Sequence, residues 1–269
     1  MSHTSNLATP DTSYDPAFFS LLFEVEDRHF WFRTRNHIIR QLVQQIALDL
    51  PFNYRVLEVG CGTGNVLRQL EQVCAKDSVM GMDLFWDGLH YAQKRVTCPL
   101  IQGDMHNPPF GVKFDLIGLF DVLEHLPDDS QVLTDLYQML APGGKLLLTV
   151  PAHTSLWSYF DEASHHYRRY QKSDLQQKLT SAGYEIEYIS YYMMSIFPLV
   201  WLGRRLASLA NQPKDRQLAD ANEMASRELK ITPGVNGLLT AWLMQESRLI
   251  AGRKQLPIGT SLLAIARKK

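Results

Sequence analysis

A glycine-rich turn after a short apolar run is the strongest chemical signal in the sequence. The run Val56–Val59 contains the acidic Glu58 and leads directly into Gly60, Gly62 and Gly64. Glycines let a backbone approach a ligand closely and adopt positive φ angles. Open α/β sheets bind ligands at the carboxyl ends of their strands, so this turn predicts a cofactor site.

The spacing of the glycines separates two kinds of cofactor. A dinucleotide fingerprint has the pattern G-x-G-x-x-G. Counted from Gly60, its third glycine would fall at Asn65, whereas the sequence reads G-x-G-x-G. Glu58 beside the turn suits a ligand with an ammonium and a sulfonium better than one with two phosphates. S-adenosylmethionine is therefore favoured, with a nicotinamide-dependent oxidoreductase or a purely structural turn as alternatives.

The segment E-V-G-C-G-T-G resembles the first motif of class I, Rossmann-like methyltransferases that use S-adenosylmethionine. Further motifs follow in the family's order between about residues 30 and 267, including Pro142-Gly143-Gly144. The resemblance implies that Asp83 accepts hydrogen bonds from the ribose hydroxyls, while Asp104 and Met105 hold the adenine. The residues that it assigns to the cofactor are Glu58, Gly60, Gly62, Gly64, Asp83, Leu84, Asp104, Met105, Phe120 and Asp121. The implied product is S-adenosylhomocysteine.

A second group of reactive side chains follows the predicted fourth strand. Glu124 and His125 stand shortly after Asp121, where side chains can face the cofactor's methyl group. The reference pKa of histidine, near 6.5, suits proton removal at neutral pH, so His125 is a candidate general base. The alternative is that Glu124 and His125 shape the loop and bind the methionine end of the cofactor.

A third group lies between Trp157 and Tyr170, where two histidines and two arginines fall within a predicted loop. Its H-x-R-R-Y element, together with H-F-W-F near the N-terminus, resembles a bacterial branch of these methyltransferases. This branch often has glycine where His165 stands. We interpret His166 as a catalytic base and Arg168 or Arg169 as a contact for an anionic or sugar-like substrate. The alternative is a structural loop. The candidate substrate residues are His29, Trp31, Arg35, Trp157, Arg168, Arg169 and Tyr170.

The sequence offers no recognised metal-ligand spacing. No pair of histidines follows H-E-x-x-H, and the adjacent His165 and His166 are poorly placed to converge on one ion. Cys61, Cys74 and Cys98 fit neither a zinc site nor a redox C-x-x-C motif. We therefore expect no metal, and free thiols favour a reducing compartment.

Composition limits the remaining classes of function. A formal net charge of -1 gives no basic field for nucleic acid. The sequence shows neither an apolar signal segment nor a run of about 18 apolar residues, so we expect a soluble, cytoplasmic protein.

We expect the acceptor to be a small molecule, a sugar or a lipid-linked compound. A non-catalytic module that binds S-adenosylmethionine is a further alternative, which the histidine groups disfavour. The oligomeric state is left open.

The elements that must position these groups alternate along the chain. Short apolar runs predict strands at 55–59, 79–83, 100–102, 114–120, 145–150, 185–191 and 261–266, with helical stretches between them. We predict a Rossmann-like, seven-stranded, mostly parallel α/β sheet with an antiparallel last strand. A loose tail is expected at 1–15, a helical lid at 16–50 and the core at 51–269. A helical insertion is expected at 195–255, with a loop at 211–233.

The apolar stretch 191–202 and the arginines after it allow two interpretations. The favoured one is a helix that packs on the core and lines a substrate pocket. The other is a membrane-facing patch that receives a lipid-linked substrate.

Overall fold

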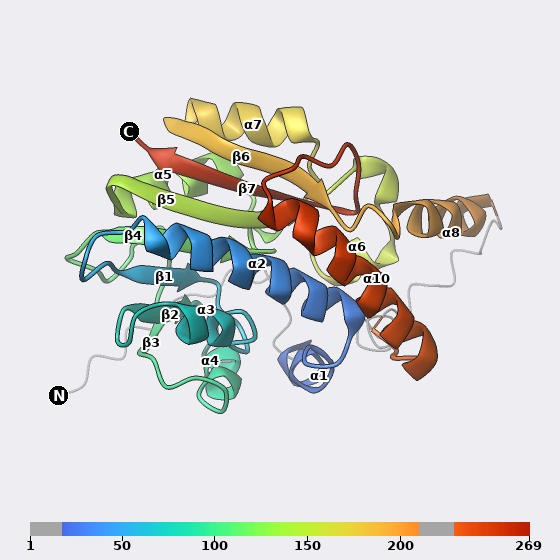
Figure 1. Cartoon of the computed structure of the whole chain (residues 1–269), viewed down its shortest axis with the longest axis horizontal. Coiled ribbons are helices and arrows are strands. Elements are labelled where there is room, and N and C mark those ends of the chain that lie inside the picture. The colour runs from blue at the N-terminus through green and yellow to red at the C-terminus, as the bar shows by residue number, and fades with distance from the viewer. Residues whose placement is uncertain (1–17, 210–228) are drawn as a thin grey trace.

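The computed structural model describes residues 18–209 and 229–269. The predicted tail at 1–15 and most of the predicted loop at 211–233 lie outside these ranges. Across the described residues the chain forms one twisted sheet with helices on both faces (Figure 1).

The sheet confirms the predicted fold class. Its strands are β1 (Val56–Val59), β2 (Val79–Asp83), β3 (Leu100–Gln102), β4 (Phe114–Phe120), β5 (Leu140–Pro151), β6 (Tyr184–Tyr192) and β7 (Ser261–Lys268). They lie in the order β3-β2-β1-β4-β5-β7-β6. β7 pairs antiparallel with both β5 and β6, and the other neighbours pair parallel. The order reverses between β1 and β4, which is where such sheets bind ligands.

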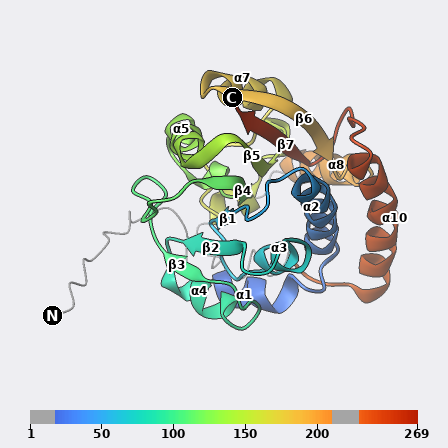
Figure 2. The ribbon, with the colours of Figure 1, turned by 60° about the vertical axis from the view of Figure 1, so that its left-hand side comes forward.

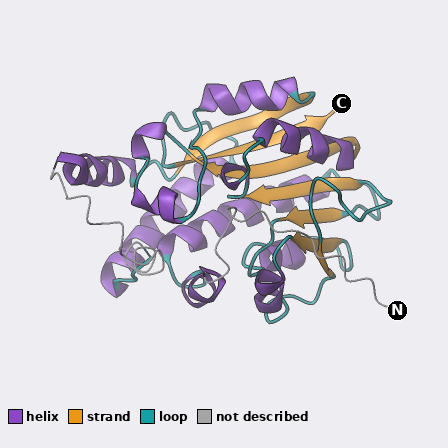
Figure 3. Cartoon of the chain, turned by 180° about the vertical axis from the view of Figure 1, so that it is seen from behind, coloured by secondary structure: helices purple, strands orange, loops and turns teal. Residues whose placement is uncertain are grey.

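Two helical layers cover the sheet because its strands are apolar on both faces. One core cluster joins the sheet to α2 (Phe30–Leu48), α3 (Leu67–Val73), α4 (Trp86–Ala92) and α10 (Pro233–Ala251). The other joins it to α5 (Asp129–Met139) and α7 (Lys172–Ser181). Figure 3, seen from behind, shows this second layer.

The segment predicted as a single lid divides into two helices with different positions. In α2, Ile38, Ile39, Leu42, Val43 and Ile46 are buried, so this helix is part of the core. Burial of its apolar stripe against the sheet makes this helix part of one of the layers that cover the sheet. The shorter α1 (Phe18–Val25) lies instead at the glycine-rich turn, where Phe19 faces Gly62 and Gly88.

Among the described residues, two helices lie between β6 and β7, in the region of the predicted insertion. α8 (Phe197–Leu209) projects from one end of the molecule (Figure 1). α10 packs outside α2 (Figure 2). The side chain of Asn236, in α10, joins this helix to the start of α2. Its Oδ1 accepts from the Phe30 backbone N at 2.8 Å, and its Nδ2 donates to the Arg28 carbonyl at 2.9 Å.

Three short helices at the strand ends carry reactive residues. They are η1 (Leu123–His125), η2 (Thr154–Leu156) and α6 (Tyr159–Ala163). α6 lies in the predicted loop and begins with a capping box between Ser158 and Asp161. Within residues 18–209 and 229–269, none of the helices combines the length and apolar character needed to cross a bilayer.

Candidate functional site

A pocket of about 680 Å³ opens at the carboxyl ends of the parallel strands. All residues that the resemblance assigns to the cofactor line it, except Gly64. An added Cβ on Gly64 would lie 3.0 Å from the Ala92 Cβ, so this glycine serves the close packing of the turn on α4. The pocket also contains His125 and His166 from the two later groups.

The glycine-rich turn and the end of β2 form one polar wall of the pocket. Gly60 and Gly62 have φ angles of +69° and +49°, which favour glycine. Asp83 is held against the turn, because its Oδ2 accepts from the Gly62 backbone N at 2.7 Å and its Oδ1 from the Phe85 backbone N at 2.9 Å. Burial raises the pKa of Asp83 to about 6.

An ion pair crosses the pocket from α2 to the end of β4. The Arg35 Nη1 lies 2.9 Å from the Asp121 Oδ2, and its guanidinium packs over the Trp31 ring. Asp121 has a φ of +54°, an unfavourable backbone conformation of the kind that clusters at functional sites. Burial raises the pKa of Glu58, and Arg35 is the positive charge that opposes this shift.

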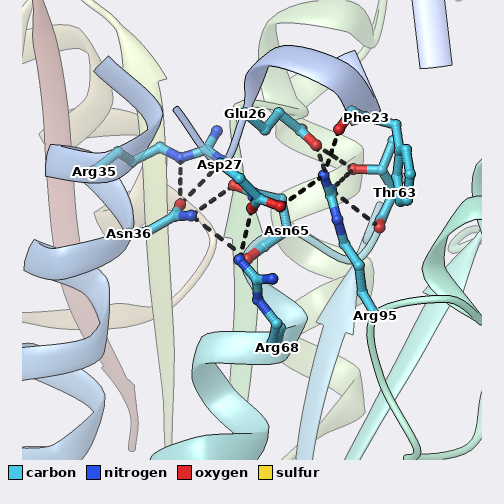
Figure 4. Close-up of polar contacts among 9 residues, drawn as sticks. All are labelled: Phe23, Glu26, Asp27, Arg35, Asn36, Thr63, Asn65, Arg68 and Arg95. Atoms are coloured by element: carbon cyan, nitrogen blue, oxygen red, sulfur yellow. Dashed lines mark hydrogen bonds and ion pairs between the residues drawn. The ribbon is translucent and has the colours of Figure 1, made fainter. Parts of the chain in front are cut away.

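A second ionic network fastens the α1–α2 connection to the glycine-rich turn (Figure 4). Glu26 Oε2 accepts from both the Thr63 hydroxyl and Arg95 Nη1. Arg95 also donates to the Phe23 carbonyl at 2.8 Å and lies over the ring of that residue. The paired Glu26 and Arg95 side chains are 7% and 4% exposed. Their burial ties α1 to the turn over which it packs.

The two histidine groups meet within the same pocket. The rings of His125 and His166 lie 4.6 Å apart, centre to centre. The His166 Nδ1 is 2.9 Å from Asp161 Oδ1, which also accepts from Arg169 Nε at 2.7 Å. Burial opposes ionisation of Asp161, but the hydrogen bonds from His166 and the charge of Arg169 hold its pKa at about 2. Burial, with His166 nearby, lowers the pKa of His125 well below 6.5.

The candidate substrate residues separate into two sets. His29, Trp31, Arg35 and Arg169 line the pocket. Trp157, Arg168 and Tyr170 do not, because their polar groups are bonded elsewhere. Arg168 donates to the carbonyls of Leu126 and Pro127 at 2.8 and 2.6 Å and pairs with Asp129. The Tyr170 hydroxyl donates to Asp129 Oδ2 at 2.9 Å, and Trp157 Nε1 to Glu162 at 3.4 Å.

His165 stands where the bacterial branch that this chain resembles often has glycine, and the backbone there adopts a conformation that favours glycine. Its φ is +55°, in the left-handed region that glycine adopts without strain. Its side chain is exposed, whereas the neighbouring His166 lines the pocket. The local turn therefore places the two adjacent histidines in different surroundings.

Several pocket residues were missed from the sequence. Phe160 and Tyr167 line the histidine end, and Phe19 lines the pocket from α1. Glu26 and Arg95 are 69 positions apart, so no local spacing relates them. In the sequence, Glu26 is marked only by its place after an apolar helical stretch.

Comparisons with known proteins agree with this geometry. A family model described as a methyltransferase domain matches residues 31–189. A probable S-adenosylmethionine-dependent methyltransferase of Mycolicibacterium smegmatis is 27% identical over 167 residues, which are 60% of this chain and 62% of that protein. A demethylmenaquinone methyltransferase of Lactiplantibacillus plantarum is 33% identical over 123 residues, which are 42% of this chain and 51% of that protein. The matches thus span 51–62% of the length of these two curated relatives.

Solved structures share the fold. A putative methyltransferase of Haloferax volcanii, solved in complex with a methyltransferase activator, aligns with a TM-score of 0.58 at 16% identity. The alignment covers 93% of this chain and 94% of that one. The family model covers more than half of the sequence, and the pocket is lined by the residues that the family motifs assign to the cofactor. The chain belongs to the class I, S-adenosylmethionine-dependent family of methyltransferase domains.

Proposed function

We propose that this protein transfers a methyl group from S-adenosylmethionine to a small-molecule acceptor with an apolar body. The observation that carries the proposal is a single pocket with two chemically different ends. One end offers the glycine-rich turn, Asp83 and Asp104 to a nucleoside. The other offers His125 and His166 among aromatic side chains.

The cofactor end is proposed to hold S-adenosylmethionine by its polar groups. Asp83 is fixed by two backbone amides, so its carboxylate is oriented before a ribose arrives. The carboxyl groups of Glu58 and Asp121 line the pocket beside the turn, and a cationic ligand would favour their ionised forms. Pre-oriented groups of this kind lower the entropic cost of binding.

The histidine end is proposed to be catalytic. A hydroxyl acceptor must lose its proton when its oxygen attacks the methyl carbon, and the carbon–sulfur bond then breaks to release S-adenosylhomocysteine. His125 and His166 are the side chains there that promote loss of that proton. Asp161 positions His166, and Arg169 in turn holds Asp161. The pocket walls also align the acceptor oxygen, the methyl carbon and the sulfur, and this alignment lowers the barrier to transfer further.

The outer faces of α8 and α10 support a lipid-linked acceptor. Leu199, Leu202 and Leu206 are 64%, 50% and 58% exposed on one side of α8. Val200 and Arg204 of the same helix line the pocket from another side. α8 contains two arginines and no acidic residue. An apolar face with basic residues suits the surface of an anionic bilayer, and it adjoins the pocket.

α10 repeats this pattern on its own outer side. Val235, Leu238 and Trp242 are 55%, 68% and 58% exposed at helical spacing, while Leu243 and Ile250 are buried on the opposite side. A relative named for demethylmenaquinone, an apolar acceptor, is consistent with such a substrate.

Labelled methyl transfer tests the function. Purified protein is incubated with methyl-labelled S-adenosylmethionine and either a bacterial lipid extract or its water-soluble fraction. We expect label in the organic phase, and we expect it to be lost in His166→Ala. Label confined to water-soluble acceptors would contradict the lipid-linked assignment, and no transfer to either fraction would contradict catalysis.

Vesicle sedimentation tests the membrane contact separately. Leu202→Glu with Leu206→Glu should lower binding to anionic vesicles at least about tenfold, because two apolar side chains no longer enter the bilayer surface. Leu48→Glu, at an 83% exposed leucine at the end of α2, is the matched control and should bind as wild type. Equal binding by all three proteins, or none by wild type, would overturn the contact.

A further inference from the structure

We propose that Glu124, His125 and His166 form a binding site for a divalent first-row transition-metal ion. The ion-binding step stands on the geometry of these three side chains. The role of the bound ion at the acceptor rests, in addition, on the proposed function. No metal-ligand spacing is visible in the sequence, because two ligands come from η1 and the third from the segment after α6.

The three side chains are already close to a coordination geometry. One ligand atom from each lies within 4.8 Å of the others. Bonds of about 2.0–2.2 Å, at the ~90–110° angles of tetrahedral or facial sites, place two ligands of one ion ~2.8–3.6 Å apart. The most distant ligand atoms must therefore approach one another by about 1–2 Å when an ion binds, which rotations of the side chains can supply.

The donor set is one that transition metals use. Two imidazoles and one carboxylate form the ligand set of several catalytic zinc sites and of facial-triad iron sites, which keep positions open for water or substrate. All three residues line the pocket, so an ion held by them would face the acceptor.

Asp161 supplies the support that a metal-bound histidine requires. A ligating imidazole almost always donates its second ring N–H to a carboxylate or carbonyl, which fixes the ring and the tautomer. Here the His166 Nδ1 is 2.9 Å from Asp161 Oδ1, which leaves Nε2 as the ligand atom. Asp161 is fully buried, and its charge also offsets that of Arg169.

Glu124 provides an independent reason for an ion. The residue is 1% exposed, and its Oε2 makes no hydrogen bond with any residue in the described ranges. A buried carboxylate oxygen without a partner is costly. A divalent ion at the three side chains would supply the missing partner.

A bound ion would serve the reaction at the acceptor oxygen. An acceptor hydroxyl that coordinates the ion loses its proton to water more readily, because the positive charge stabilises the alkoxide. The oxygen then forms its bond to the methyl carbon as the carbon–sulfur bond breaks. The nucleoside product and the proton leave, and the ion is unchanged.

Cobalt titration of chelator-treated, dialysed full-length protein tests the site. Co²⁺ is the probe because its visible absorption reports nitrogen and oxygen ligation. We expect one Co²⁺ per chain at this site. Glu124→Gln and His166→Asn should each weaken its binding at least tenfold. Asp161→Asn, which keeps all three ligands, should weaken it about 10- to 100-fold.

The matched control is the surface pair of His106 and Asp135, whose Nδ1 and Oδ2 lie 2.7 Å apart. His106→Asn should leave the Co²⁺ spectrum and affinity unchanged. Circular dichroism on every variant checks that it is folded. Co²⁺ binding that persists in folded Glu124→Gln and His166→Asn, or that is absent from wild type, overturns the site. Titration of the same wild-type preparation with S-adenosylhomocysteine separates the two proposals, because failure of the metal site leaves cofactor binding intact.

Discussion

At the scale of single residues, Asp83 links protonation to cofactor binding. Burial raises its pKa to about 6, and a ribose is best held by the ionised carboxylate. The affinity for S-adenosylhomocysteine should therefore be full above pH 6 and fall as the pH drops through that value. Asp83→Asn should weaken binding at pH 8 by about ten- to hundredfold, a loss of roughly 1.5–3 kcal/mol.

Calorimetry from pH 5 to 8 measures both effects. The variant should bind with little dependence on pH, because the titrating group is gone. A wild-type affinity that stays constant down to pH 5, or unchanged binding in Asp83→Asn, would remove this carboxylate from the cofactor site.

His166 should affect turnover and not cofactor binding. His166→Ala should lower kcat by about 10²-fold or more, the usual contribution of a group that promotes proton loss. Its affinity for S-adenosylhomocysteine should stay within about twofold of wild type. The neighbouring His165→Gly is the control, because that side chain is exposed and its φ of +55° suits glycine. Equal loss of cofactor affinity and turnover in His166→Ala would argue for a structural role.

At the scale of elements, the connection between α1 and α2 depends on one buried ion pair. Glu26→Ala removes the buried partner of Arg95, which is 4% exposed and whose remaining ion pair among the described residues is a 3.6 Å contact with the more exposed Asp27, so the substitution should cost about 3–5 kcal/mol of unfolding free energy. Asp27→Ala is the matched control next to it. Asp27 is 42% exposed and pairs with the half-buried Arg68 and, at 3.6 Å, with Arg95, so its loss leaves the buried Glu26–Arg95 pair in place and should cost about 1 kcal/mol or less. Urea unfolding measures the free energy of unfolding of both variants. Similar losses in Glu26→Ala and Asp27→Ala would contradict the role of the buried ion pair.

The start of α2 should make the protein sensitive to acid. His29 caps this helix by accepting from the Trp31 backbone N at 3.3 Å, and burial lowers its pKa to about 4. The unfolded chain binds a proton at His29 near pH 6.5, whereas the folded chain resists it. Stability from this residue is therefore present above pH 6.5 and lost as the pH falls toward 4, by up to about 3 kcal/mol.

Thermal melts between pH 4 and 7.5 measure that loss. His29→Asn keeps a capping side chain without the titrating ring, so its melting temperature should fall less steeply over this range. Parallel curves for the variant and wild type would show that His29 is not responsible.

Elements with strong local signals were predictable from the sequence. The central strands are short continuous apolar runs, so their positions follow from composition, and the antiparallel last strand follows from the family resemblance. α6 was missed because five residues show no helical period, although Ser158 and Asp161 have capping-box spacing. α2 was predicted as part of a lid because its apolar stripe does not reveal which surface it covers.

At the scale of the whole molecule, the fold brings distant segments to one pocket. The glycine-rich turn, the end of β4 and the segment after α6 all lie at the carboxyl edge of the sheet. The sequence motifs predicted residues that line one pocket, because the residues of each motif are contiguous. They could not pair Arg35 with Asp121 or Glu26 with Arg95, because those contacts depend on how α1 and α2 dock. For the same reason, Arg168 and Tyr170 were predicted as substrate contacts, although their polar groups are bonded outside the pocket.

The central claim to test is the identity of the ligand that binds at the glycine-rich turn. Calorimetric titration of the purified protein with S-adenosylhomocysteine, and separately with NAD, measures it. We predict one S-adenosylhomocysteine per chain, no binding of NAD, and loss of the nucleoside in Gly62→Val, whose side chain would strain a φ of +49° and fill the approach to the turn. Binding of NAD in place of S-adenosylhomocysteine, or unchanged binding by a folded Gly62→Val, would contradict the account.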